Sequence, residues 1–177
     1  MYNILLAGFG GQGILFAGKQ LANAGMKAGK EVSWLPSYGP EMRGGTANCS
    51  VIIDEQPIGS PLVTTPRVLL AMNLPSFKKF ENKVLPGGII ICDSSLIPAK
   101  TARTDVSAYY IPATVMASEH GIEGMANVIM LGHFLKVCHL FAYDYFEQAM
   151  ISSIPPKREK LIEVNKKALS LGYHYAE

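Results

Sequence analysis

The chain has 177 residues, of which 49% are hydrophobic and 17% charged, and its formal net charge at pH 7 is +2. This length suits one domain with a substantial core, so we expect a single domain over residues 1–177. A net charge this small argues against binding to nucleic acid or to an anionic membrane. No apolar stretch reaches spanning length, and residues 1–3 lead into a strand without a basic signal-peptide start, so we expect a cytoplasmic protein.

The first predicted strand runs directly into a glycine turn and a helix. Residues 3–7 precede a G-x-G-x-x-G pattern, and an amphipathic stretch with small residues on its apolar face covers about residues 12–29. In this order a phosphate can approach the backbone N–H groups at the start of the helix. The candidate contacts with a phosphate or a partner backbone are Gly8, Gly10, Gly11 and Gly13.

Two alternatives stay open for this turn. The same glycines would also be explained by close packing of strand and helix without any ligand. Gln12 can hydrogen-bond a ligand or cap the start of the helix.

The second predicted strand, residues 31–36, does not support a dinucleotide site. A Rossmann site for NAD places an acidic residue at the end of its second strand, where it binds the ribose. Here Glu31 stands at the start of the strand, and the far end is Trp34-Leu35-Pro36. We therefore consider a phosphate or packing role for the turn the better interpretation.

Strands and helices alternate along the rest of the chain. Further strands are expected at residues 47–54, 67–73, 89–93 and 107–111, and a helix from 73 to about 83 with Asn73 as N-cap. Helices are then predicted for residues 113–119, 127–141, 144–152 and 156–171, with Gly172 as the C′ residue of the last. The pattern predicts an α/β fold, a doubly wound and mainly parallel sheet flanked by helices, with a helical C-terminal third.

The helix at residues 127–141 is apolar on almost every side, so we expect it to be buried, partly at a subunit interface. We also expect the isolated chain to self-associate. Asn127 at its start is interpreted first as an N-cap and second as a site residue.

A second unusual loop covers residues 36–46. In a doubly wound sheet a loop at this position lies over the ligand crevice, beside the first glycine turn. An arginine here can reach a phosphate in bidentate fashion, and it can equally pair with a nearby acid or a helix end. The candidate site residues of this loop are Ser37, Tyr38, Glu41, Arg43 and Gly44.

The cysteines and histidines do not suggest a metal centre. Cys49, Cys92 and Cys138 are isolated and fall in predicted strands and an apolar helix, and the four histidines lack zinc spacing. An iron–sulfur cluster needs four ligands of this kind.

Taken together, three segments resemble the gamma subunit of 2-oxoacid:ferredoxin oxidoreductases. They are Gly8-Phe-Gly-Gly-Gln-Gly13, Pro36-Ser-Tyr-Gly-Pro-Glu-Met-Arg-Gly-Gly45 and Asn127-Val-Ile-Met-Leu-Gly132, and the second is long and specific. The resemblance implies oxidative decarboxylation of a 2-oxoacid with coenzyme A, passing electrons to ferredoxin. It also implies that thiamine diphosphate, magnesium and iron–sulfur clusters reside on the alpha, beta and ferredoxin-like delta subunits.

On this resemblance the chain itself has no catalytic residue and helps to enclose the active site and to accommodate coenzyme A. Arg43 is our candidate to clamp a phosphate of coenzyme A or to form an inter-subunit salt bridge. The 2-oxoacid is not determined, with 2-oxoglutarate slightly favoured over pyruvate, branched-chain oxoacids and indolepyruvate. The competing hypotheses are a free-standing NAD(P)- or flavin-binding oxidoreductase and a nucleotide-sensing regulatory module.

Overall fold

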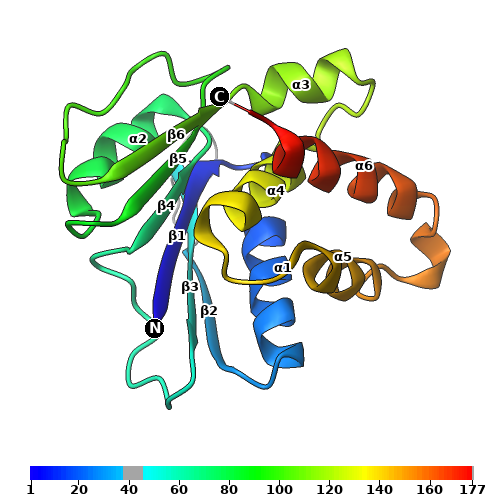
Figure 1. Cartoon of the computed structure of the whole chain (residues 1–177), viewed down its shortest axis with the longest axis horizontal. Helices are drawn as coiled ribbons and strands as arrows, with labels where there is room; N and C mark the ends of the chain where they lie inside the picture. The colour runs from blue at the N-terminus through cyan, green and yellow to red at the C-terminus, as the bar shows by residue number, and fades with distance from the viewer. Residues whose placement is uncertain (38–45, 177) are drawn as a thin grey trace.

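The computed structural model describes residues 1–37 and 46–176, which form one six-stranded sheet with helices against both faces (Figure 1). The strands are β1 (Tyr2–Phe9), β2 (Glu31–Ser37), β3 (Thr46–Asp54), β4 (Val68–Ala71), β5 (Ile89–Asp93) and β6 (Ser107–Ile111). The α-helices are α1 (Ile14–Lys27), α2 (Leu74–Phe80), α3 (Ala113–Glu119), α4 (Ala126–Cys138), α5 (Tyr143–Ile151) and α6 (Leu161–His174). Two short 3₁₀ helices are η2 (Glu81–Lys83) and η3 (Pro156–Arg158).

The strand order is β2-β3-β1-β4-β5-β6. β4, β5 and β6 run parallel to β1, whereas β3 runs antiparallel to both β1 and β2. The expected mainly parallel α/β sheet is therefore confirmed, with β3 inserted between β1 and β2 in the opposite direction. As a result, the carboxyl ends of β1, β4, β5 and β6 all lie along one edge of the sheet.

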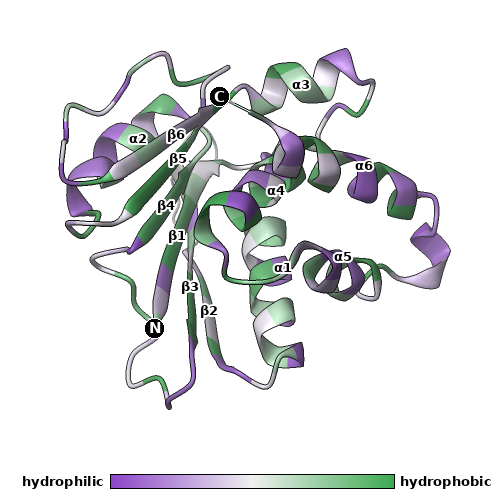
Figure 2. Cartoon of the chain, in the orientation of Figure 1, coloured by the Kyte–Doolittle hydropathy of each residue, from purple (hydrophilic) through white to green (hydrophobic). Residues whose placement is uncertain are grey.

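Apolar residues of the central strands alternate between two cores, as the period of a strand requires. On β1, Ile4 and Leu6 pack with α1 and α4, whereas Leu5 and Ala7 pack with Phe77 of α2 on the other face. Hydropathy colouring shows this as green strands in the middle of the molecule, with purple concentrated on the outer helices (Figure 2). The strands most central to the sheet are thus held from both sides.

The helix predicted to start after Asn73 is confirmed at its beginning. The Asn73 side chain accepts a hydrogen bond from Ser76 N–H at 2.7 Å, the geometry of an N-cap. The α-helix itself ends at Phe80, and η2 continues it to Lys83. The last predicted turn of this helix is therefore present, but as a 3₁₀ helix, which is wound more tightly than an α-helix.

The apolar helix α4 is buried by this chain's own elements. Val128, Ile129, Met130 and Leu131 are fully buried, and α6 makes the most extensive contact with α4. The chain therefore does not need a subunit interface to cover this helix, although self-association itself stays a prediction. The predicted end at residue 141 is wrong, because His139 adopts a left-handed conformation with φ 50° and ends the helix at Cys138.

Helix α4 has 13 residues. Across the two described stretches of the chain, no helix has both the length and the apolar character needed to cross a bilayer.

Two glycines allow α4 and α6 to cross at very short distance. A Cβ atom added to Gly172 would lie 1.8 Å from the carbonyl oxygen of Ile129, and one added to Gly132 would lie 2.1 Å from that of Leu169. Gly172 lies inside α6, so its predicted role as C′ residue is wrong. The glycine is needed for helix packing rather than for ending the helix, and the sequence of one helix alone cannot distinguish these roles.

We expect Gly172→Ala to lower the free energy of unfolding by an amount at the upper end of about 1–3 kcal/mol. The reason is that the added methyl group meets backbone atoms rather than a flexible side chain. The measurement is the urea midpoint of unfolding. Gly59→Ala is the matched control, since a Cβ atom there meets nothing within 4 Å. Equal midpoints for the two variants would contradict the proposed close crossing.

Candidate functional site

The glycine turn follows β1 and starts α1 with a left-handed residue. Gly13 is the N-cap of α1, with φ 74° and ψ 20°, and Gly11 also has a positive φ of 93°. Positive φ angles of this size favour glycine, because the backbone of a residue with a Cβ atom is strained in this conformation. The turn therefore takes the conformation that its sequence pattern predicts.

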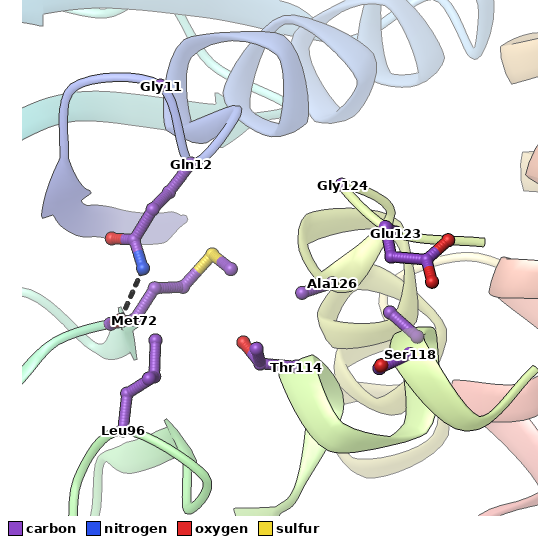
Figure 3. A pocket seen from close by; sticks show the side chains of 10 residues that line it. Gly11, Gln12, Met72, Leu96, Thr114, Ser118, Glu123, Gly124 and Ala126 are labelled. Atoms are coloured by element: carbon purple, nitrogen blue, oxygen red, sulfur yellow. Dashed lines mark hydrogen bonds between the residues drawn. The ribbon is translucent and has the colours of Figure 1, made fainter. Parts of the chain in front are cut away.

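Gln12 is occupied by contacts within the protein. Its side-chain carbonyl oxygen accepts a hydrogen bond from Phe9 N–H at 2.6 Å, and its amide nitrogen donates to the carbonyl of Met72 at 2.8 Å. The second bond ties the turn after β1 to the end of β4 (Figure 3). The main role of the Gln12 side chain is therefore to stabilise the conformation of the turn.

Gly8 and Gly13 are closely packed against side chains that would have to shift to admit a Cβ atom. A Cβ atom on Gly8 would lie 2.6 Å from Oε1 of Gln12, and one on Gly13 would lie 2.3 Å from Nδ2 of Asn127. For these two positions the packing interpretation is supported.

Asn127 joins the first turn of α4 to this glycine turn. Its side-chain amide donates to the carbonyl of Gly13 at 3.1 Å, and the residue is only 5% exposed. The predicted N-cap role is wrong, because α4 starts at Ala126 and Asn127 makes its bond to a residue 114 positions away. The structure therefore brings Asn127 to the predicted site in a supporting position.

Gly10 and Gly11 are the exposed part of the turn. A Cβ atom on Gly11 would meet nothing within 4 Å, so this glycine borders open space. Of the four candidate glycines, Gly10 and Gly11 are therefore the ones a ligand could approach.

A cavity of about 390 Å³, which we call the β4-side pocket, opens beside Gly11. Its walls come from segments that follow β1, β4, β5 and β6, at the carboxyl edge of the sheet where doubly wound folds bind ligands. The volume falls in the range usual for small-molecule sites. Its lining residues are Gly11, Gln12, Met72, Leu96, Thr114, Ala117, Ser118, Glu123, Gly124 and Ala126.

Most of these walls were not anticipated from the sequence. Thr114, Ser118 and Glu123 come from segments that carry no recognisable motif, and Met72 resembles ordinary core. These residues could have been found only from the predicted topology. Each of their segments follows a strand parallel to β1, so all of them lie at the same edge of the sheet.

Asp93 has a structural role at this edge. The carboxylate is fully buried and accepts hydrogen bonds from the backbone N–H of Ser95 at 3.0 Å and of Thr114 at 3.2 Å, and from the Thr114 hydroxyl. It therefore fixes the start of α3, which forms one wall of the β4-side pocket.

A second hollow, of about 280 Å³, lies on the other side of the glycine turn, and we call it the β3-side hollow. It is lined by glycine backbone and by apolar side chains, including Phe9 and Phe16. Both phenylalanines are 39% exposed, so apolar surface remains uncovered at this place.

The loop predicted to cover the crevice lies largely outside the described residues. This applies to Tyr38, Glu41, Arg43 and Gly44. Ser37, the last residue of β2, is described and exposed, and it lines a separate groove with Asn48 and Leu62 rather than the β4-side pocket.

The sheet order adds a physical argument against a dinucleotide site. In the Rossmann fold the second strand lies next to β1, so its terminal acid can reach the ribose of a ligand bound at the glycine turn. Here β3 lies between β1 and β2. The end of β2 is thereby moved one strand further from the glycine turn.

All three cysteines are buried and lie on separate elements, β3, β5 and α4. Burial raises the pKa of Cys49, Cys92 and Cys138 to about 12. Within residues 1–37 and 46–176 there is also no group of three His, Cys, Asp or Glu side chains arranged to hold a metal ion. The described part of this chain offers neither a reactive thiol nor ligands for an iron–sulfur cluster.

We expect the native protein to resist thiol reagents at pH 8, since a pKa of about 12 leaves on the order of one thiol in 10⁴ as the reactive thiolate. Absorbance with a chromogenic disulfide reagent measures this. Three equivalents should react rapidly only after denaturation in guanidinium. Rapid reaction of one thiol in the folded protein would contradict the burial.

Comparison with known proteins identifies the family. The model of the family "Pyruvate ferredoxin/flavodoxin oxidoreductase" matches residues 3–175. The chain belongs to this family. The resemblance inferred from the three sequence segments is thus confirmed.

Relatives in this family differ in how much of their own length matches this chain. The chain is 41% identical over 175 residues to the ketoisovalerate oxidoreductase subunit VorA of Methanothermobacter thermautotrophicus, covering 98% of this chain but only 36% of that protein. It is 36% identical to the 2-oxoglutarate synthase subunit KorC of Methanocaldococcus jannaschii, covering 98% of this chain and 93% of that protein.

Among solved structures, the gamma subunit of a keto/oxoacid ferredoxin oxidoreductase from Geobacter sulfurreducens superimposes with a TM-score of 0.83 at 28% identity. The match covers 98% of this chain and 96% of that one. The same fold therefore occurs as a whole subunit and as about a third of a longer polypeptide.

Proposed function

We propose that the chain is the gamma subunit of a complex that oxidatively decarboxylates a 2-oxoacid with coenzyme A. The products are an acyl-CoA and CO₂, and the electrons pass to ferredoxin. Thiamine diphosphate, magnesium and the iron–sulfur clusters are assigned to alpha, beta and ferredoxin-like delta partners. This chain encloses the active site and accommodates coenzyme A, and it is inactive alone.

The observation that carries this proposal is the β4-side pocket at the carboxyl edge of the sheet. It is large enough for part of a cofactor, yet none of its described lining residues is a histidine, a cysteine or a lysine. Its Thr114 hydroxyl already donates to Asp93, and Ser118 has no neighbouring histidine or lysine in this lining to activate it as a nucleophile, so the pocket suits binding better than catalysis. Such a division of labour is expected of a subunit whose partners hold the reactive groups.

The exposed Phe9 and Phe16 support contact with a partner close to the glycine turn. Two large apolar side chains beside one hollow are typical of a surface that another protein covers. A partner seated there would lie next to Gly10 and Gly11, so coenzyme A bound at the turn would be close to the subunit boundary.

The identity of the 2-oxoacid is assigned to the partners as well. The relatives include both a ketoisovalerate oxidoreductase subunit and a 2-oxoglutarate synthase subunit. We propose that the thiamine-binding subunits make this choice, because the decarboxylated carbon is bound to them.

Co-expression with alpha, beta and delta subunits tests the proposal. We expect the chain to co-purify with them, and the complex to reduce ferredoxin only when 2-oxoacid and coenzyme A are both present. The purified chain alone should show no turnover.

Two results would contradict the assignment. One is oxidoreductase turnover by the isolated chain. The other is saturable micromolar binding of NAD(H) or NADP(H), followed by quenching of the single tryptophan, Trp34.

Arg43→Ala tests the proposed phosphate clamp. We expect the assembled complex to lose apparent affinity for coenzyme A by about 1–3 kcal/mol, the scale of a charge-assisted hydrogen bond, while assembly is retained. Steady-state kinetics with varied coenzyme A measure this, and size-exclusion chromatography follows assembly. Collapse of the complex would instead identify Arg43 as an interface residue.

A further inference from the structure

We infer that β2 is a self-association surface, at which two copies of this chain pair edge to edge, antiparallel and about a two-fold axis at Trp34. Self-association is expected from the sequence, but the apolar helix that suggested it, α4, is buried by the chain's own elements. Another surface is therefore needed, and the sheet supplies one. The inference goes beyond the proposed function and does not depend on it.

The strand β2 lies at one end of the sheet (Figure 1). Its seven residues, Glu31–Ser37, pair with β3 on one side, and no strand of the described chain pairs with the other side. An edge of this kind presents backbone N–H and C=O groups that another strand can bind. Charged side chains commonly block such edges, but residues 32–37 carry no charge. The edge of β2 is therefore open to pairing.

The opposite end of the sheet is less suited to this role. There β6 has five residues, and the charged Lys100 lies over the ring of its Tyr110. A longer and uncharged edge gives a second strand more backbone to bind, so β2 is the better candidate.

Pro36 indicates which backbone groups of β2 face outward. Proline has no N–H, so in a sheet it is found on edge strands with its nitrogen turned away from the neighbouring strand. Alternate residues of a strand direct their backbone groups to the same side, so Val32 and Trp34 face outward together with Pro36. The free edge then offers the N–H groups of Val32 and Trp34 and the carbonyls of all three residues.

A second copy of β2 is complementary to this edge. Trp34 is the middle residue of the strand, so a two-fold axis there gives the longest antiparallel overlap. The two Trp34 residues then exchange both backbone bonds, and each Val32 N–H donates to the Pro36 carbonyl opposite. Glu31, the one charged residue of β2, lies opposite Ser37, so the strand pair brings no like charges together. A contact of this symmetry closes after two copies.

Exposed apolar side chains flank the edge on the α1 face of the sheet. Trp34 is 36% exposed and Met26 is 67% exposed. A Cβ atom on Gly18 would lie 3.1 Å from the indole nitrogen of Trp34, so the side of α1 that carries Gly18 contacts β2. Ala22 and Met26 follow Gly18 at intervals of four residues, which places Met26 on this side as well. A second copy would cover this surface.

The other face of the sheet has an apolar surface beside β2 too. Leu35 lines a groove of about 340 Å³ together with Leu62, which is 65% exposed. Contiguous apolar surface of this kind is typical of a place that another protein covers. Both faces next to the β2 edge thus favour association.

Disulfide formation between two variants of the full chain tests the register. In the proposed pairing Ser33 lies opposite Leu35 of the second copy as a non-hydrogen-bonded pair, with Cα atoms about 4.5 Å apart, within disulfide range. We expect a mixture of Ser33→Cys and Leu35→Cys chains to form a covalent dimer on oxidation. Each variant alone should not, because its two cysteines would be offset diagonally by roughly 7–8 Å. The native cysteines are buried, with the pKa raised to about 12, so they should not compete.

Sedimentation velocity measures the non-covalent dimer. The unmodified chain should sediment as a dimer at micromolar concentration. Trp34→Glu, which places two carboxylates together at the axis, should raise the dissociation constant at least about tenfold. Leu161→Glu is the matched control, because Leu161 is an exposed apolar residue on α6.

Amide hydrogen exchange gives a readout that needs no variant. Protection of the Val32 and Trp34 N–H groups should rise with protein concentration, because these groups bond only to the second copy. Ser33 and Leu35 face β3, so their N–H groups should be protected at every concentration.

Three results would overturn the inference. One is a chain that stays monomeric at every concentration, as it would if β2 paired only with a strand of another subunit. Another is exchange at Val32 and Trp34 that does not depend on concentration. The third is a covalent dimer that either cysteine variant forms equally well alone, since this would place the axis elsewhere.

Discussion

Two side-chain amides fix the turn between β1 and α1, and both cavities beside it depend on that turn. Gln12 connects the turn to the end of β4, and Asn127 connects it to the first turn of α4. Each hydrogen bond is modest in energy, but together they set the positions of three elements that form the β4-side pocket. Because these bonds lie within the chain, the pocket is formed before any ligand arrives.

The antiparallel strand β3 changes what a familiar motif can do. The strand, the glycine turn and the helix at the start of this chain resemble those of a dinucleotide-binding fold. The inserted β3 moves β2 away from β1, and the acid expected at the end of β2 is also absent. The site that remains draws most of its polar side chains, Thr114, Ser118 and Glu123, from the segments that follow β6.

The fold was largely predictable from local patterns, and the site was not. Apolar runs gave the strands, and Asn73 and the glycine turn gave two helix starts, because these features depend on residues near in sequence. The roles of Asn127 and Gly172 depend on residues 114 and 43 positions away, so a single segment could not reveal them. Glu123 and Ser118 carry no motif at all, and only the strand order brings them to the edge where Gly11 lies.

The close packing of α4 against α6 couples the positions of these two helices. Backbone lies directly on backbone at Gly132 and Gly172, with no side chain between them to absorb a displacement. Gly124 and Ala126, at the start of α4, are part of the pocket wall, whereas much of α6 faces outward. A neighbouring protein that displaced α6 would therefore move the wall of the cavity with it. Binding of that protein and binding of a ligand in the pocket would then be coupled through the packed pair α4 and α6.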